Sequence, residues 1–320
     1  MSAEISRIAR GVPTTLRFQF LNGADAVADA GAVTISIVDG SGTSVVSSTS
    51  ATADSPAGNY SYDLAARTVL GLLVVTWTVT ATGATFERVY EVVSSRYFTL
   101  TAARASHDEL AADGDFSDDQ VLEKRDAVEL EIERITGLSF CRRRALLVLD
   151  GPGTAVLALP VRFVRQVVSV TTYDRLGGSG TAFTAGQLAA IARDDEMPPD
   201  SCTGLLVRTD GAVWPSGRRN VVVVVEHGYE TAPPDVRGAA LRLLYWRLHT
   251  RNTEVLDRAT TYAAAGATFA LAKASQTSTG IDEVDAVLGS YGKRGRDGAN
   301  APASQVMRLS RNRAGSLFHR

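Results

Sequence analysis

Cysteine and histidine, which often bind metal ions or act as nucleophiles and bases, are few in this sequence, and their spacing matches none of the common reactive motifs. Neither Cys141 nor Cys202 has the CxxC partner of a zinc site, and no histidine belongs to an HExxH motif. Ser216 lies in Pro-Ser-Gly rather than in the GxSxG turn of a nucleophilic serine. We therefore expect no metal, no cofactor and no enzymatic activity, although the chain has four histidines: His107, His227, His249 and His319.

Three polar segments leave alternatives open. The acidic run Asp194-Asp195-Glu196 could hold a divalent ion, but its position beside Pro198-Pro199 favours a solvated loop. Asp235 lies near the expected start of a helix, where capping accounts for an aspartate. Gly177-Gly178-Ser179-Gly180 is expected to be a flexible loop rather than a phosphate site, because no Lys-Ser/Thr pair follows it.

Composition is typical of a soluble globular protein with room for two domains and a tail. The 320 residues are 45% hydrophobic and 21% charged, with a net charge of −2. Residues 293–320 hold seven Lys or Arg and one Asp, a charge of +6, so residues 1–292 carry −8. No apolar run is long enough for a membrane span or a signal peptide. We expect a cytoplasmic protein in which free thiols are favoured over a disulfide.

Residues 1–96 have the pattern of an all-β domain. Five stretches alternate polar and apolar residues, and clusters of Gly, Asn, Asp and Pro separate them, which is typical of half-buried strands joined by turns. Some seven short strands at this spacing predict an antiparallel β-sandwich of immunoglobulin-like size, with Trp77 in its core. The alternating stretches are residues 16–20, 33–38, 60–64, 75–80 and 86–92.

Residues 97–292 are expected to combine helices with a small β-sheet, which makes the fold class multidomain α+β. Thr101 can cap a short helix, and Ser117 with Gln120 forms a capping box for a helix that ends at Thr136 before Gly137. One face of this helix is strongly polar. It is either a solvated face, a ring lumen or a contact between subunits; its charged members are Glu123, Lys124, Asp126, Glu129, Glu131 and Glu133.

The central unit of this region is the segment 220–248. Five valines, residues 221–225, predict a buried strand; Gly228 permits a tight turn, and Pro233-Pro234 start a helix. Other short strands are expected at 145–149, 155–159, 164–173 and 204–208, and a helix at 281–291. Residues 253–280 are expected to be mobile or ordered by a partner. Residues 293–320 are expected to be a basic, flexible C-terminal tail.

Four segments in a fixed order resemble the head–tail connector (adaptor) proteins of long-tailed bacteriophages. They are DAVELEIERITGLSF, then Leu159-Pro160 with VRQVVSVTTYD, then VVVVVEHGYETAPPDVRGAALRLLYWRL, and finally IDEVDAVLGSYGKR. The most specific part is a hydrophobic strand followed by Glu-x-Gly-Tyr, Pro-Pro-Asp-Val-Arg and a helix. The resemblance covers residues 99–292; the N-terminal β domain departs from the smallest members of the family and would project outward.

The resemblance implies a homo-oligomeric ring of twelve subunits in the virion neck, between capsid and tail, assembled in the host cytoplasm. Its partners would be the portal protein and further neck or tail-completion proteins. Double-stranded DNA would pass through the lumen without specific binding, and an acidic body would repel it. The basic tail would dock on the portal through Lys293, Arg294, Arg296, Arg308, Arg311 and Arg313.

Four residues are candidates for the subunit interface: Tyr245, Trp246, Glu129 and Glu133. The aromatic pair is chosen because aromatic residues are enriched at interaction hot spots, although Trp246 could equally close the core. A different class of function also remains open, a surface- or carbohydrate-binding β module on a helical oligomeric stalk. That alternative explains residues 1–96 but leaves the four ordered segments unexplained.

Overall fold

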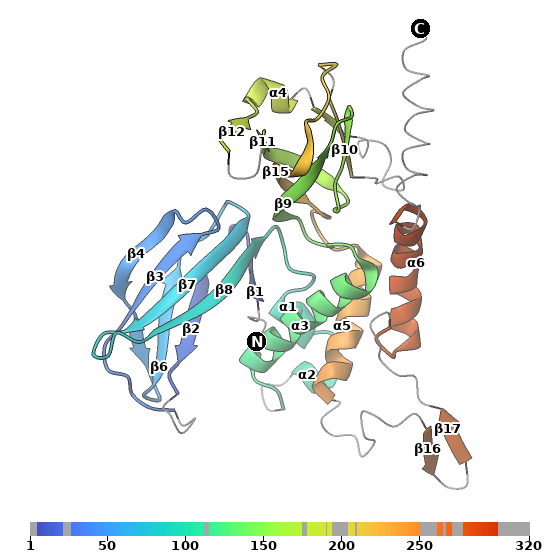
Figure 1. The fold of residues 1–320 in the computed structure, drawn as a ribbon. Helices are drawn as coiled ribbons and strands as arrows, with labels where there is room; N and C mark the ends of the chain where they lie inside the picture. Colours follow the sequence, from blue (N-terminus) through green and yellow to red (C-terminus); the bar gives the residue numbers. More distant parts are fainter. Residues whose placement is uncertain are drawn as a thin grey trace.

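The computed structural model shows an N-terminal β region beside a helical layer, with a second β region above the helices (Figure 1). The fold is therefore mixed α+β with several separate sheets. The structure describes residues 5–21, 27–111, 115–174, 178–189, 191–193, 204–208, 210–249, 261–264, 267–270 and 278–299.

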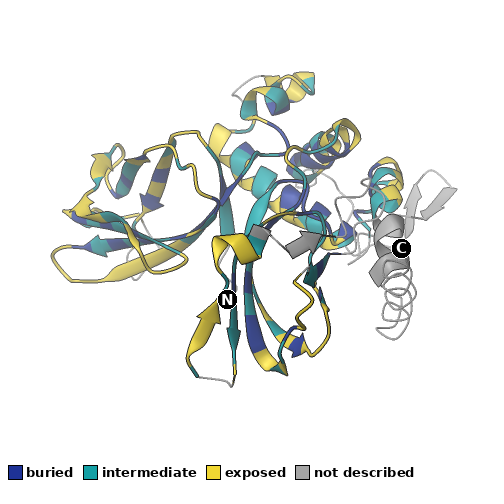
Figure 2. Cartoon of the chain, turned by 90° about the horizontal axis from the view of Figure 1, so that it is seen from above, coloured by how far each residue is buried: buried dark blue, intermediate teal, exposed yellow. Residues whose placement is uncertain are grey.

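Two sheets of the N-terminal region enclose one apolar core. Trp77 is fully buried in it and stacks on Phe18 of the opposite sheet, with 5.4 Å between ring centroids. In the strands at 14–19, 33–39 and 71–79, alternate residues face this core, so buried positions alternate with more exposed ones (Figure 2). One sheet has the order β1 (Ile5–Ala9), β8 (Thr85–Val93), β7 (Gly71–Val79), β3 (Val33–Asp39), β4 (Ser44–Ser50); the other has β2 (Thr14–Gln19), β6 (Asn59–Leu64), β5 (Thr52–Asp54).

The expectation of a wholly antiparallel arrangement is wrong for one strand pair. β1 runs parallel to β8, with Ile5 opposite Val89 and Ala9 opposite Val93. A period-two pattern predicts which residues form a strand and which face is buried, but it does not fix the partner or its direction. β1 therefore lies at the edge of a mixed sheet.

Five helices of the second region are described: α1 (Leu100–Arg104), α2 (Asp108–Ala111), α3 (Asp118–Thr136), α5 (Pro234–His249) and α6 (Asp282–Ala299). The predicted capping box of α3 is present, and Gly137 ends the helix in the left-handed conformation with φ of 68°. The cap of α1 is Thr99 rather than the predicted Thr101, because the Thr99 hydroxyl accepts from the backbone N–H of Ala102.

Helices α3, α5 and α6 pack around one apolar core. Val128 and Ile132 of α3, Leu243 and Leu244 of α5, and Leu288 of α6 are buried in it. Trp246 lies on the opposite side of α5 and is 50% exposed, so the alternative in which it closes the core is wrong.

The second β region holds a third apolar core. A four-stranded sheet has the order β12 (Gly180–Ala182), β11 (Val164–Tyr173), β15 (Ser216–His227), β9 (Arg143–Pro152), and a three-stranded sheet has β10 (Val156–Ala158), β14 (Leu205–Arg208), β13 (Ile191–Arg193). The predicted valine strand forms the centre of β15: Val221, Val223 and Val225 are buried against Trp214 and Leu157. The short helix α4 (Ala185–Ala189) was not predicted.

The C-terminal part adds one element to the expectation and differs from it at another place. Within the segment predicted to be mobile or ordered by a partner, the strands β16 (Thr261–Ala264) and β17 (Ala267–Ala270) form a hairpin. Helix α6 continues to Ala299, so Lys293, Arg294 and Arg296 lie on a helix rather than in an irregular tail. Other predictions fall outside the described residues, namely those for Asp194-Asp195-Glu196, Cys202, Arg308, Arg311 and Arg313. Among the helices described, none is long and apolar enough to cross a membrane.

Candidate functional site

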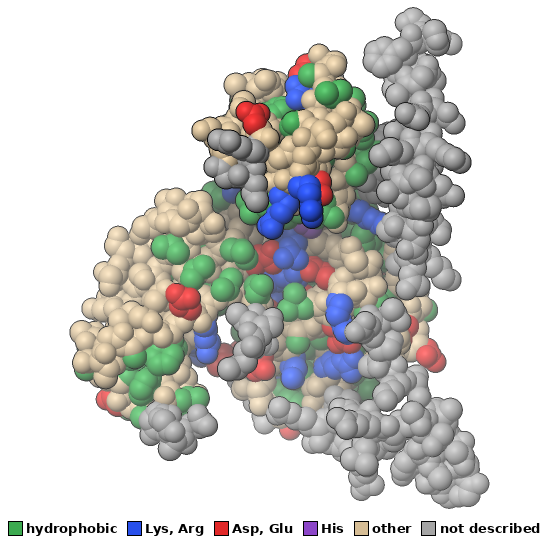
Figure 3. Space-filling model, viewed as in Figure 1, with side chains coloured by type: hydrophobic (Ala, Val, Ile, Leu, Met, Phe, Trp, Pro, Cys, Tyr) green, Lys and Arg blue, Asp and Glu red, His purple; other side chains and the backbone are tan. Residues whose placement is uncertain are grey.

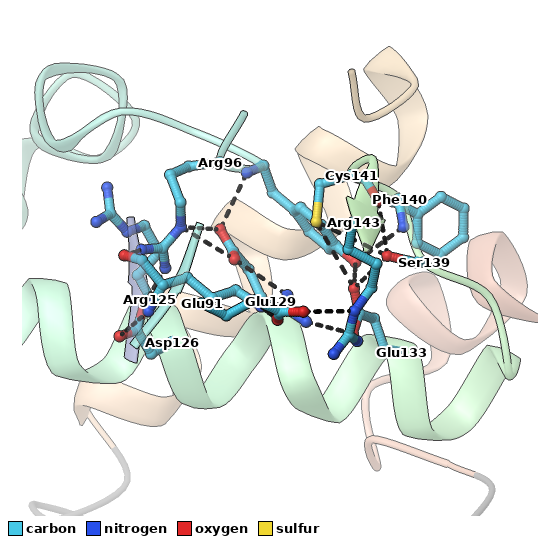
Figure 4. Close-up of polar contacts among 12 residues, drawn as sticks. Glu91, Arg96, Arg125, Asp126, Glu129, Glu133, Ser139, Phe140, Cys141 and Arg143 are labelled. Atoms are coloured by element: carbon cyan, nitrogen blue, oxygen red, sulfur yellow. Dashed lines mark hydrogen bonds and ion pairs between the residues drawn. The ribbon is translucent and has the colours of Figure 1, made fainter. Parts of the chain in front are cut away.

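The part of the polar face of α3 that holds Asp126, Glu129 and Glu133 meets the N-terminal region instead of solvent, whereas Glu123 is exposed and Glu131 pairs with Arg247 of α5. The Glu129 side chain is 0% exposed and Glu133 is largely buried, and both lie at contacts within this chain. The predictions of a solvated face and of a subunit contact for these two residues are therefore wrong. The reason is that arginines from distant parts of the sequence cover this face (Figure 4).

Arg7 of β1 is the centre of this junction. Its guanidinium is 0% exposed and pairs with Glu91 of β8 and Glu129 of α3, each at 3.4 Å, and with Glu133 of α3. Burial lowers the pKa of Arg7, but the negative charge of Glu133 and its neighbours more than compensates, so the pKa is raised. Arg7 is therefore charged at every pH at which the protein folds.

Arg96, in the segment before α1, pairs with the Glu129 carboxylate that also meets Arg7. Its Nε donates to both oxygens of Glu129 at 3.1 Å, and its Nη2 donates to Asp126. The backbone N–H of Tyr97 also donates to Glu129, at 3.0 Å. The Glu129 carboxylate thus accepts from Arg7, Arg96 and one backbone amide, which satisfies it without water.

Arg143, the first residue of β9, joins the second β region to this group. Its Nε donates to Glu91 at 2.8 Å and its Nη1 donates to Glu133 at 3.1 Å. Arg125 of α3 lies beside the cluster, and burial, with the positive charge of Arg96, lowers its pKa to about 10. Three guanidinium groups thus pair with four carboxylates. The ion cluster is Arg7, Arg96, Arg143, Glu91, Asp126, Glu129 and Glu133, with Arg125 beside it.

The ion cluster also closes the open edge of the N-terminal sheet. The backbone N–H of Arg7 donates to Asp126 at 3.4 Å, and the backbone oxygen of Arg7 accepts from the Arg96 guanidinium. The backbone N–H and C=O groups of an unpaired edge strand can pair with a strand of another molecule. Side chains of α3 and of the segment before α1 therefore replace a neighbouring strand at β1.

The thiol of Cys141, which lies beside the ion cluster, has low reactivity. Burial raises the pKa of Cys141 to about 12, although the positive charge of Arg7 opposes the shift. A thiol that is protonated at neutral pH is a poor nucleophile and a poor metal ligand. Cys141 is a free thiol. Within the described ranges, no group of three His, Cys, Asp or Glu is placed to hold a metal ion.

The turn between β15 and α5 ties the second β region to the same junction. Glu226 pairs with Arg142 and Arg144 at 2.7 Å each. Gly228 has φ of 98°, and a Cβ at this position would lie 2.4 Å from the backbone oxygen of Cys141, so no other residue fits without a shift of the backbone. The Glu-x-Gly-Tyr segment is thus constrained by contact with the chain after α3.

The last residues of this turn continue the junction toward its surface. Tyr229 stacks on Phe140, with 5.3 Å between centroids, and Glu230 accepts from Arg10 at 2.7 Å. Lys and Arg side chains gather on the face between the second β region and the helices, with acidic side chains among them (Figure 3). The junction is therefore a buried ion cluster bordered by half-exposed ion pairs.

The aromatic pair predicted at a subunit interface separates into two environments. Tyr245 donates a hydrogen bond to Glu109 and stacks on His107, with 4.2 Å between ring centroids. Trp246 is the more exposed of the two. Tyr245 is thus engaged by α2 and its neighbouring segment, and only Trp246 presents a large apolar surface to solvent.

The ion cluster holds elements in place and has no arrangement suited to proton or group transfer. Its carboxylates are paired with guanidinium groups, and the adjacent thiol is protonated. The sequence predicted the importance of Glu129 and Glu133 but missed Arg7, Arg96 and Arg143. These arginines lie singly in three segments and form no motif, so no local signal could have found them.

Comparisons with known proteins give one slight similarity. No protein-family model matches the chain, and no curated protein matches it. The chain is similar to part of a solved structure described as "Neck of empty GTA particle computed with C6 symmetry", with 18% identity and a TM-score of 0.39. The match covers 50% of this chain and 82% of that chain. A similarity at this level identifies neither the fold nor the function.

Removing one carboxylate from the ion cluster is expected to destabilise the protein strongly. Glu129→Gln keeps the size of the side chain but leaves Arg7 and Arg96 buried without their shared partner, which should lower the free energy of unfolding by about 3–5 kcal/mol. Urea denaturation measures this free energy of unfolding. Asp119→Asn removes an exposed pair with Arg17 and should cost less than about 1 kcal/mol. Equal effects of the two variants would contradict a structural role for the cluster.

His227 should make stability depend on pH. Burial, with the positive charge of Arg143 opposite it on β9, lowers its pKa to about 4, below the unfolded value of 6.5. The unfolded chain therefore binds the proton first, and stability is lost as pH falls from 6.5 toward 4, by about 2–3 kcal/mol. The measurement is the difference in unfolding free energy between pH 7.5 and pH 5 for the wild type and for His227→Gln. The same difference in both proteins would exclude His227 as its source.

Cys141 should resist thiol reagents until the protein unfolds. In a Cys202→Ser background, 5,5′-dithiobis(2-nitrobenzoate) should release almost no colour from the folded protein at pH 8 and one equivalent in guanidinium chloride, because burial keeps the thiol protonated and covered. The absorbance at 412 nm is the readout. Rapid release from the folded protein would show that the junction opens in solution.

Proposed function

We propose that this chain is a structural protein of a phage-like virion neck. In this proposal it is a head–tail connector (adaptor) of a long-tailed bacteriophage that forms a ring of twelve subunits between portal and tail. The N-terminal β region is its immunoglobulin-like domain and projects from the ring. The protein acts as a conduit for double-stranded DNA and as a docking platform, not as an enzyme.

The observation that carries the proposal is the packing of the four segments in which the chain resembles connectors. Three of them contribute α3, α5 and α6, which pack around one core, and two contribute the paired strands β11 and β15. Segments that are far apart in sequence thus form one continuous framework. The segments thus lie in two adjoining cores that the chain between β15 and α5 connects, an arrangement that a shared fold accounts for.

The charge distribution supports passage of DNA without adhesion. Residues 1–292 carry a net charge of −8. The arginines of the junction are neutralised by carboxylates, which leaves them unable to bind phosphates. A ring of such subunits repels DNA from its wall, while the basic residues after Gly292 remain for docking on the portal.

Trp246 is the candidate anchor between neighbouring subunits. A ring needs two different faces on each subunit, and an exposed tryptophan on a helix is a common hot spot for such contacts. Glu129, Glu133 and Tyr245 are occupied within the chain and are not proposed again for this role.

The purified protein is expected to form rings, alone or with a portal protein, that negative-stain microscopy and light scattering detect. Trp246→Ala should weaken ring formation, whereas Val213→Ala, also at an exposed apolar residue, should not.

Deleting residues 300–320 should weaken portal docking and leave the body folded, because α6 ends at Ala299.

A strictly monomeric protein that binds glycans and no portal would overturn the proposal and favour the surface-binding alternative. Unchanged docking after the deletion would exclude a role for residues 300–320 while leaving the ring itself intact.

A further inference from the structure

The sheet that contains the valine strand is apolar on both faces. Val221, Val223 and Val225 face the core, while Val222 and Val224 face outward beside Val148 and Leu146 of β9. Leu146 is 68% exposed, although the solvent face of an antiparallel sheet is usually polar. Neighbouring apolar side chains that are exposed on one face are typical of an interaction site.

This outer face forms one wall of a groove. The opposite wall is the start of β7 and the loop before it, with the exposed side chains of Val69 and Leu72. The groove has a volume of about 480 Å³; Leu146, Val168 and Val224 are apolar residues of its first wall, and Asp39, Arg67 and Arg144 also line it. Hydrophobic side chains are visible at the surface where the N-terminal β region meets the second one (Figure 3).

The groove lies beside a free strand edge. β9 is the last strand of its sheet and pairs with β15 on one side; no other strand in the described ranges pairs with it. Alternate backbone groups of such an edge point outward and can receive another strand. The site therefore offers both apolar contacts and backbone partners to an extended segment.

The hairpin β16–β17 is a segment of this chain that needs such a surface. Thr261 pairs with Ala270 and Tyr262 with Phe269, and within the described part of the chain neither strand pairs with a third. A hairpin of two strands is marginally stable in water by itself. Residues 261–270 contain no charged residue, which matches the apolar groove.

The position of the hairpin in the fold favours a groove on another copy, because β16 and β17 lie beyond the far end of α5, away from β7 and β9 (Figure 1). α5 begins shortly after β15 and carries the chain away from that sheet for 16 residues, about 24 Å at the rise of a helix. The segment with the hairpin follows the far end of α5, whereas the groove lies beside Val224, near the end of β15 that leads to α5.

We propose that the groove between β7 and the outer face of the β9–β15–β11 strands receives the β16–β17 hairpin of a second copy of this chain. The hairpin covers Leu146 and lies along the free edge of β9. Donor and acceptor surfaces differ, so each copy can give and receive, which is the heterologous contact that closes a ring. The inference rests on the ring of the proposed function and names one of its contacts.

Cross-linking between two tagged copies tests the contact. In a Cys202→Ser background, one copy carries Leu146→Cys and the other Ala263→Cys, and mild oxidation is expected to join the two tags in one band on a denaturing gel. Val213→Cys, at another exposed apolar position, should give no such band with Ala263→Cys. A disulfide within a single chain that carries both substitutions, or none in assembled rings, would overturn the proposal.

Two further variants separate this contact from the ring as a whole. Replacing residues 261–270 by a Gly-Ser segment of equal length, or Leu146→Asp, should weaken assembly at least tenfold in light scattering, with the circular dichroism of the body retained. Val213→Asp is the matched control. Intact rings from both variants would refute the hairpin contact alone. Absence of rings in the wild type, even with a portal protein, would refute the proposed function instead.

Discussion

A buried arginine is the constraint on which the arrangement of this molecule depends. Taking a guanidinium out of water costs several kcal/mol unless carboxylates meet it, and Arg7 finds them on β8 and α3. The described residues form three separate apolar cores, in the two sheets of the N-terminal region, in the helices and in the second β region. Charge pairing, together with a few shared apolar contacts such as Val93 of β8 in the helical core, fixes how these cores sit against each other.

Features that depend on neighbours in sequence could be predicted well. The capping box at Ser117 and the left-handed Gly137 bound α3 as expected, because both act within one helical turn. The valine run became the centre of β15, and Trp77 lies in the core, because alternation of polar and apolar residues is a local signal. The same reasoning gave most strands of residues 1–96.

Features that depend on distant partners could not be predicted. A helix face rich in Glu has the same sequence whether water or arginine covers it, so the burial of Glu129 was not expected. The edge position and parallel direction of β1 depend on β8, some eighty residues away. The groove beside Leu146 has the same origin, since its two walls belong to different cores and the ion cluster sets the space between them.

The large sequence separation between Arg7 and its partners has a consequence for the order of folding. Its partners on α3 lie 119–126 residues further along the chain. During synthesis, the other strands of the N-terminal sheets emerge and pair long before α3 exists, while β1 carries a cation with too few counter-charges to be buried. We therefore expect β1, although it precedes the other strands of its sheet in the sequence, to take its place in that sheet last.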